Sequence, residues 1–335
     1  MYNRAQKYNR IYKNFPSRLP NFTPLKVYES TKDFFSSDPV VLTIGTFDGV
    51  HAGHLAVIDV LKKTAVEIGG KTALLTFHPH PRVILHPSNH GLKLLNTLDE
   101  RRRLLQDSGL DFLIVEEFNL ELSRLTPFEY VKNLFAEEIK PAAVVIGDDH
   151  RFGRNREGDF NALREMGKMF DFEVIALDAK YVQDIRVSST KVRSAVEKGD
   201  VAQANKLLTR PFPLKGEVVG GQKLGSELGY PTANLKIEEE LKIIPGAGAY
   251  AVWATTEGGD RKMAMLNIGD RPTVSDSGCT TIEVNLLDFT GDLYGSSLEV
   301  EFVDRIRDER KFSSLNELKS ALKIDEENTR KLLGT

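Results

Sequence analysis

The chain of 335 residues is long for one domain and sufficient for two. With 41% hydrophobic and 28% charged residues and a net charge of −3, it has a globular composition and no whole-chain case for binding nucleic acid or an anionic membrane. No stretch approaches about 18 uncharged apolar residues, so no membrane span is expected, and the single Cys279 excludes an internal disulfide and fits the cytoplasm.

Residues 1–22 form a basic tail without a single acidic residue. A basic, acid-free segment can be an organelle-targeting peptide, but this one has only one serine and a poor apolar face. We therefore interpret it as a solvated tail and leave its purpose open.

Residues 23–200 alternate short apolar runs with amphipathic stretches, which predicts an α/β domain with a doubly wound parallel sheet. In such sheets ligands bind beyond the carboxyl ends of the strands. The expected strands are Val40–Ile44, Thr72–Phe77, Phe112–Val115, Ala143–Gly147 and Glu173–Leu177. The expected helices are Leu55–Ile68, Asp99–Asp107, Pro127–Glu138 and Phe160–Phe170.

A glycine-punctuated turn joins the first of these strands to the first helix. We expect Gly45, Gly49 and Gly53 to allow positive φ and a close approach of the backbone to a ligand. His51 and His54 stand three residues apart at the start of the helix, so both rings can face one anion beside its free N–H groups. The pattern indicates a phosphate site, although a plain surface turn is the alternative.

The string Gly45-Thr-Phe-Asp-Gly-Val-His-Ala-Gly-His54 resembles the HxGH signature of the nucleotidyltransferases and, in this longer form, the FAD synthetases. The resemblance implies that Phe47 and Asp48 also belong to the nucleotide site.

Two further strand ends carry candidate binding residues. The second strand leads into Thr76-Phe-His-Pro-His-Pro81, where His80 is either solvated or at the ligand edge; the string resembles another motif of that family. The fourth leads into Ile146-Gly-Asp-Asp-His-Arg-Phe-Gly153, which resembles a third motif and implies binding roles for Asp149 and Arg151. His150 stands where the family usually has Phe.

The segment Ile185-Arg-Val-Ser-Ser-Thr-Lys-Val-Arg193 contains hydroxyls in front of an expected helix. Ser188 or Ser189 can simply cap that helix. Alternatively, Ser188, Ser189 and Thr190 form a second anion site with Arg193, as the resemblance to the family's Ser-Ser-Thr-x-Ile-Arg motif implies.

Residues 201–213 are predicted to be a linker, because two prolines flank Phe212 where the pattern changes. In residues 214–335 alternation of period two predicts an antiparallel barrel or sandwich followed by C-terminal helices. The expected strands are Gly216–Val219, Ala249–Ala254, Lys262–Ile268, Thr280–Leu287 and Leu298–Ile306, and the expected helices are Ser314–Leu322 and Glu326–Leu333.

A glycine-dense loop ending in Pro231-Thr-Ala-Asn234 opens this second half. Thr232 and Asn234 are two residues apart, so in an extended chain both oxygens face one way, as a shared Mg²⁺ would require. The loop resembles the Pro-Thr-Ala-Asn motif of riboflavin kinases, although alone it would be a plain turn. Its expected phosphate-binding residues are Gly220, Lys223, Gly225 and Gly229.

Later motifs resemble the same kinases in the same order, and they imply binding roles for Asn267 and Arg271. Glu283 takes the place of the family's catalytic glutamate, and we expect an inward carboxylate on a barrel strand that accepts the proton of the ribityl 5′-hydroxyl. Ser226 and Asn285 depart from the family's usual Arg and His.

The chain therefore resembles a prokaryotic bifunctional riboflavin kinase/FAD synthetase from about Val40 to its C-terminus. The resemblance implies ATP-dependent phosphorylation of riboflavin to FMN, followed by adenylylation of FMN to FAD with release of pyrophosphate. ATP, riboflavin, FMN and FAD would be substrates and products, with Mg²⁺ or Mn²⁺ as cofactor, no nucleic-acid or membrane partner, and transient self-association left open. The alternatives are that one half alone is active, with the kinase half the more doubtful, or that the protein is a non-catalytic flavin sensor.

Overall fold

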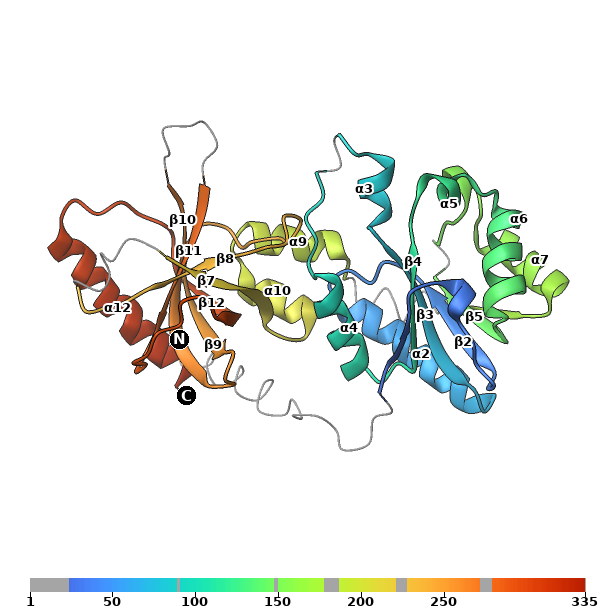
Figure 1. Ribbon diagram of the computed structural model, residues 1–335, viewed down its shortest axis with the longest axis horizontal. Coiled ribbons are helices and arrows are strands. Elements are labelled where there is room, and N and C mark those ends of the chain that lie inside the picture. The colour runs from blue at the N-terminus through green and yellow to red at the C-terminus, as the bar shows by residue number, and fades with distance from the viewer. Residues whose placement is uncertain are drawn as a thin grey trace. The chain divides into compact units, whose positions relative to one another are not determined.

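The computed structural model describes residues 24–88, 91–147, 150–177, 187–220, 228–271 and 279–334. The described residues divide into two compact units, the first ending at Ser189 and the second beginning at Thr190 (Figure 1). The sequence predicted the end of the first domain at residue 200, eleven residues later than this division.

The first unit contains one parallel sheet of six strands in the order β1-β4-β3-β2-β5-β6. The prediction of a parallel α/β sheet is confirmed. Its strands are β1 Lys26–Tyr28, β2 Val40–Ile44, β3 Lys71–His78, β4 Phe112–Glu117, β5 Ala143–Ile146 and β6 Glu173–Ala176. The sequence missed β1, whose three residues are too few to show a period.

The helices of this unit begin at polar caps. Thr97 and Glu100 form a reciprocal capping box at α4, and Thr126 with Glu129 does so at α6. The predicted helix Pro127–Glu138 is α6 followed by a π-helical stretch, η2 Val131–Ile139. The bounds are α2 Ala52–Glu67, α3 Pro81–Leu85, α4 Leu98–Asp107, α5 Leu120–Arg124, α6 Pro127–Tyr130 and α7 Phe160–Phe170, with short 3-10 turns η1 Thr31–Asp33 and η3 Arg154–Arg156.

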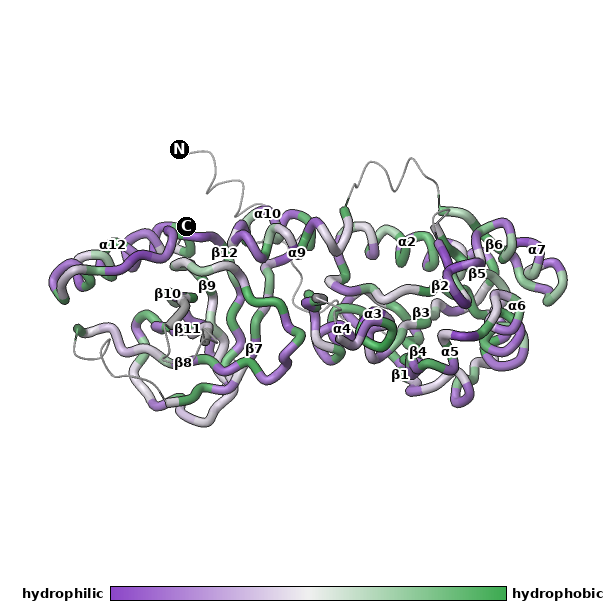
Figure 2. Tube along the Cα trace, turned by 90° about the horizontal axis from the view of Figure 1, so that it is seen from above, coloured by the Kyte–Doolittle hydropathy of each residue, from purple (hydrophilic) through white to green (hydrophobic). Residues whose placement is uncertain are grey.

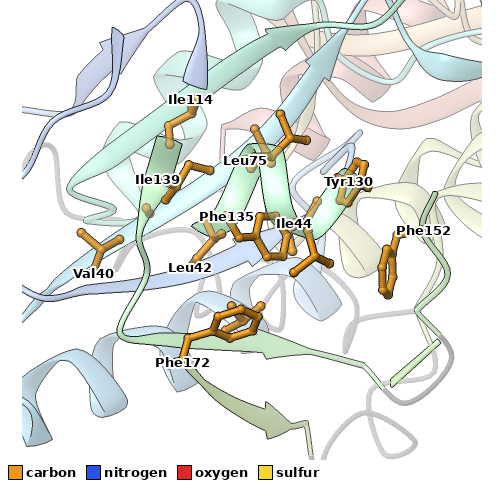
Figure 3. Packing of buried hydrophobic residues seen from close by; sticks show 14 of the residues in the cluster. Val40, Leu42, Ile44, Leu75, Ile114, Tyr130, Phe135, Ile139, Phe152 and Phe172 are labelled. Atoms are coloured by element: carbon orange, nitrogen blue, oxygen red, sulfur yellow. The ribbon is translucent and has the colours of Figure 1, made fainter. Parts of the chain in front are cut away.

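The sheet is buried on both faces, which explains its uninterrupted apolar strands. Alternate residues of β2 belong to different clusters: Leu42 and Ile44 pack with Phe135 of η2, whereas Val41 packs with Leu61 of α2. Figure 3 shows the first cluster, with Leu42, Ile44 and Phe135 close together at its centre. The two layers of helices thus hold the carboxyl ends of β2 and β3 in fixed positions.

The second unit is a closed antiparallel barrel of six strands in the order β10-β11-β8-β7-β12-β9. The prediction of an antiparallel barrel is confirmed. The strands are β7 Phe212–Val219, β8 Ala233–Lys236, β9 Gly248–Thr256, β10 Arg261–Arg271, β11 Cys279–Leu286 and β12 Ser297–Arg307, and the helices are α9 Ser189–Glu197, α10 Val201–Leu208 and α12 Leu315–Leu333. The sequence missed β8, which is short and half polar.

Tyr250, Phe212 and Phe302 fill the barrel interior, with the Tyr250 and Phe302 ring centroids 5.2 Å apart. Helix α12 packs against β9, β10 and β12 (Figure 1). In Figure 2 its trace changes repeatedly between hydrophilic and hydrophobic colours, as an amphipathic helix on a barrel surface should. It is one continuous helix, so the expected break between Leu322 and Glu326 was wrong, since no Gly or Pro interrupts that segment.

The segment predicted as a linker is made of α10 and the start of β7. The side chain of Asn205 is 1% exposed; its amide donates to Phe302 O at 2.8 Å and its carbonyl accepts from Phe212 N at 2.8 Å. These bonds bind the segment to the barrel.

Candidate active sites

His51 and His54 lie stacked where β2 ends and α2 begins. His51 is the N-cap of α2, and its Nδ1 accepts from the backbone N–H of His54 at 3.3 Å. The two rings are 3.7 Å apart between centroids and 10° from parallel, and Phe47 stacks on the other side of His54 at 4.4 Å. Stacking fixes both imidazoles beside the positive end of the helix dipole, a suitable place for an anion.

The backbone of this turn contains unusual torsions. Gly49 has φ of 92°, as expected, but Phe47 and Val50 also have positive φ, at 47° and 36°. Gly53 does not have a positive φ, so the predicted reason for a glycine at this position was wrong. A Cβ there would lie 3.2 Å from the His51 ring, and the glycine instead leaves room for that ring. Gly45 likewise stands beside the Phe47 ring, at 3.1 Å, without a positive φ.

Asp48 is 1% exposed and serves the scaffold of the turn. Its carboxylate accepts from the backbone N–H groups of Leu95 and Asn96 at 3.0 and 3.1 Å, and its carbonyl accepts from the Ser189 hydroxyl at 2.9 Å. Asp48 therefore joins the histidine turn to the hydroxyl motif, a role that the sequence alone did not indicate.

The other predicted residues of this site lie on several elements. His80 is the N-cap of α3, where its Nδ1 accepts from Arg82 N at 3.1 Å, and the side chain of Arg151 is exposed. Ser188 directly precedes α9, and Thr190 and Arg193 lie on that helix. Asp149, Lys223 and Gly225 lie outside the described residues, as do Ser226 and the side chain of Arg271.

In the second unit three predicted residues form one row across neighbouring strands. Asn234 of β8 pairs with Glu283 of β11, which pairs with Asn267 of β10. Directly paired residues project to the same face of a sheet. The row lies on the face opposite to the buried Ile282 and Val284, so Glu283 points out of the barrel interior. The expectation of an inward carboxylate was wrong, because the apolar alternate positions occupy the interior.

A pocket of about 200 Å³ lies on this outer face, beside α12. Glu283, Asn267 and Thr232 contribute polar groups to it. The rest of its lining comes from β9, β10, β11, β12, α12, the loop before β8 and the segment between β12 and α12. It consists of Leu228, Tyr230, Ala249, Met265, Leu266, Asn285, Arg307, Glu309, Arg310, Phe312, Leu318, Leu322 and Asp325. A largely apolar wall with a few convergent polar groups suits a flat aromatic ligand.

A second hollow, of about 400 Å³, is also lined by the loop that carries Thr232. Gly220 and Tyr294 contribute to it, and a Cβ on Gly220 would lie 3.1 Å from the Tyr294 hydroxyl. Thr232 lines both hollows, so the two hollows border each other at this residue.

Asn285 supports the loop between the two hollows. Its amide donates to the carbonyl of Pro231, the residue before Thr232, at 2.7 Å. The departure from the family's usual His thus retains a hydrogen bond that holds Thr232 in place. Gly229, also predicted in this loop, has φ of 87°.

Sequence reasoning missed the residues by which α12 closes the first pocket. Asp325 accepts a forked pair of bonds from Arg307 of β12, with Nη2 at 2.9 Å and Nε at 3.0 Å from Oδ2. Tyr230 donates to Glu326 at 3.1 Å, and burial, followed by this bond, raises the pKa of its phenol. The spacing of Leu318, Leu322 and Asp325 on one face of the helix was the available signal.

Across the described ranges, no helix has the length and apolar character needed to cross a membrane. The same residues contain no cluster of three or more His, Cys, Asp or Glu side chains suited to a metal ion.

Comparisons with known proteins agree with this division into two units. Residues 35–191 match the family model of FAD synthetase, and residues 208–333 match that of riboflavin kinase. A solved structure titled macrolide-efflux protein, from Streptococcus pneumoniae, is similar with a TM-score of 0.81 at 32% identity, covering 92% of this chain and 99% of that one.

Curated relatives carry the name bifunctional riboflavin kinase/FMN adenylyltransferase. The relative from Pseudomonas fluorescens is 38% identical over 85% of this chain and 90% of its own length. Those from Listeria monocytogenes and Escherichia coli K12 are each 35% identical, over 90% and 88% of this chain and 94% and 93% of their own lengths. The chain belongs to the family of bifunctional riboflavin kinases and FMN adenylyltransferases.

Proposed function

We propose that the two activities of this bifunctional enzyme are divided between its two units, with riboflavin kinase in the barrel and FMN adenylyltransferase in the parallel sheet. The kinase transfers the γ-phosphoryl group of ATP to riboflavin, giving FMN and ADP. The adenylyltransferase transfers AMP from a second ATP to FMN, giving FAD and pyrophosphate. The matches of residues 35–191 and 208–333 to the separate family models support this division.

In the kinase, riboflavin occupies the pocket beside α12 and ATP occupies the hollow at Gly220 and Tyr294. Thr232 lines both, so the ribityl 5′-hydroxyl and the γ-phosphate meet at its loop. This shared residue is the observation that carries the assignment, because phosphoryl transfer requires two bound substrates to be held in line.

Glu283 is the proposed general base. It lines the riboflavin pocket and pairs with Asn234 across the β8–β11 ladder, so its carboxylate lies next to the loop where the two substrates meet. It accepts the proton of the 5′-hydroxyl as that oxygen attacks the γ-phosphorus. Asn267 borders the same carboxylate from β10.

Thr232 and Asn234 are the proposed ligands of Mg²⁺ or Mn²⁺. Both are half-buried, they stand two residues apart in extended chain, and their hydroxyl and amide oxygens are the hard donors that Mg²⁺ prefers. When bound, the ion neutralises charge on the transferred phosphate. Gly220, Lys223, Gly225 and Gly229 are the proposed phosphate loop, with Arg271 as a further nucleotide-binding residue.

In the adenylyltransferase, the FMN phosphate attacks the α-phosphorus of ATP and pyrophosphate leaves. His51 and His54 donate to the charge that accumulates in the transition state, together with the N-terminus of α2. Phe47 holds His54 by stacking, and Gly49 gives the turn its shape. Ser188, Ser189, Thr190 and Arg193 are the proposed second phosphate site, with His80, Asp149 and Arg151 as further nucleotide-binding residues.

A cytoplasmic location completes the proposal, because both reactions consume ATP and one cysteine in 335 residues fits a reducing compartment.

The test is chromatography of flavins after incubating the purified chain with ATP, Mg²⁺ and riboflavin, or with FMN in place of riboflavin. Sequential FMN and FAD from riboflavin support both assignments. FMN without FAD contradicts the adenylyltransferase site, and FAD made only from supplied FMN contradicts the kinase site. Flavin binding without any product contradicts the catalytic proposal as a whole.

A further inference from the structure

Arg101 is a buried cation that no motif of the sequence singled out. It lies on α4, is 2% exposed, and contacts the turn that leads to His51 through Thr46. Arginine is almost never fully buried unless its charged group is paired with other polar or charged groups. Burial lowers the pKa of its guanidinium, and the nearby Asp48 carboxylate opposes that shift.

The guanidinium joins the carboxyl ends of two neighbouring strands. Its Nη1 donates to Thr46 O at 2.6 Å and to Thr76 Oγ1 at 3.2 Å. Thr46 lies just beyond β2, in the turn, and Thr76 lies near the end of β3. In addition to the β2–β3 ladder, one side chain therefore bridges the two strand ends at the edge where a substrate of a parallel sheet binds.

The segment before α4 holds the same turn from another direction. Leu95 N and Asn96 N donate to Asp48, and the Asn96 amide donates to Glu100, the residue before Arg101, at 3.3 Å. The turn from Thr46 to Asp48 is thus bonded at both ends to the segment from Leu95 to Arg101.

These bonds offset the backbone cost of the turn. Phe47 and Val50, at φ of 47° and 36°, occupy a left-handed region that is strained for a non-glycine residue. Phe47 directly follows Thr46, and its ring stacks on His54. A contiguous chain of contacts therefore runs from Arg101 through Thr46 and Phe47 to His54.

We propose that Arg101 is a positioning residue for adenylyl transfer: its guanidinium holds the turn in the geometry that presents His51 and His54 to the phosphates of ATP. This inference rests on the proposed function of the first unit. In this role Arg101 maintains the shape of the site and makes no contact with substrate.

The experiment compares Arg101→Lys, which keeps the charge but removes the planar fork, with Arg103→Lys on the exposed face of the same helix. Misplacement of a catalytic group by about 1 Å costs up to about a hundredfold in rate, so we expect Arg101→Lys to lower kcat for FAD formation from FMN by about ten- to a hundredfold. The KM values for ATP and FMN should stay within about threefold, because uniform binding is retained. Arg103→Lys should leave both parameters unchanged.

Riboflavin kinase activity of the same variants separates positioning from a general loss of folding. The proposal is overturned if Arg101→Lys retains the wild-type kcat, or if it raises both KM values while kcat stays constant. It is also overturned if kinase activity and FAD formation fall together with the unfolding temperature.

If Arg101→Lys does not fold, Thr76→Val decides, because it conserves volume while removing one acceptor of the guanidinium, together with the 3.4 Å bond from the Thr76 hydroxyl to Thr46 O in the same network. A fall in kcat for FAD formation supports the proposal, and an unchanged kcat overturns it. Absence of FAD formation in the wild-type chain would instead refute the proposed function of the unit, so the two failures are distinguishable.

Discussion

Glu283 of β11 stands directly opposite Asn234 of β8. The two residues are far apart in the sequence, and closure of the barrel places them on one face beside Thr232. The proposed base of the kinase and a proposed metal ligand are therefore fixed by the hydrogen bonds of one ladder, which limits their relative movement.

The first prediction concerns this carboxylate. Glu283→Gln keeps size and hydrogen bonding but cannot accept a proton, so kcat for FMN formation should fall by at least about a hundredfold. FAD formation from supplied FMN should be unchanged, which provides the control within the same chain. Steady-state assays of both reactions test this. Retention of kinase activity by Glu283→Gln would remove Glu283 from the role of base.

The sequence correctly predicted features that depend on residues adjacent in the chain. The turn from Gly45 to His54 follows β2 and opens α2 as expected, because the strand, the turn and the helix start are contiguous. The predicted inward orientation of Glu283 was wrong, because an alternating strand does not reveal which of its faces is covered by α12. Its pairing with Asn234 depends on barrel closure, which no local pattern contains.

Two buried charged residues were also not predicted from the sequence. Arg101 and Asp325 are 2% and 3% exposed, yet each stands in an amphipathic helix rich in charged residues. In sequence such residues look like a solvated face. Their partners, Thr46 and Arg307, are supplied by distant elements, so only the folded structure distinguishes them from exposed neighbours such as Arg103.

The second prediction concerns the stacked histidines. His51→Ala combined with His54→Ala removes both ring donors, and loss of one preorganised donor typically lowers kcat about 10²–10³-fold. FAD formation should become undetectable while FMN formation from riboflavin stays at the wild-type rate. His86→Ala, at the exposed C-cap of the short helix α3, is the matched control. Loss of both activities in the double variant would contradict the assignment of two separate sites.

The third prediction concerns the ion pair that holds α12 against the barrel. Asp325→Asn keeps the volume but leaves Arg307 without its counter-charge, and breaking a partly buried pair should cost about 2 kcal/mol of unfolding free energy. Because Asp325 itself lines the pocket together with Leu318 and Leu322 of the same helix, riboflavin affinity should fall more than kcat.

The control for this variant is Asp288→Asn, which breaks an exposed pair with Arg330 on the same helix. It should alter neither riboflavin affinity nor stability measurably. Quenching of riboflavin fluorescence gives the affinity, and urea unfolding gives the stability. Equal effects of the two substitutions would show that the pocket is insensitive to how α12 is anchored.

The fourth prediction is a loss of stability at alkaline pH. Burial raises the pKa of Tyr250 from 10.0 to about 12, with Arg305 opposing the shift, and its hydroxyl donates to Gly246 O. The folded state therefore disfavours the phenolate, so this contribution to stability is complete below pH 10 and is lost as the pH rises from 10 towards 12.

Urea unfolding of the wild type and of Tyr250→Phe at several pH values measures this contribution. The difference in unfolding free energy between the two proteins should be constant from about pH 7 to 9, where the Tyr250 phenol is neutral in both the folded and the unfolded chain. Above pH 10 the wild type should lose stability relative to Tyr250→Phe, because only the wild type has the Tyr250 phenol, which ionises more readily in the unfolded chain than in the folded barrel. A difference that stays constant across the whole range would mean that Tyr250 ionises as readily in the folded barrel as in the unfolded chain.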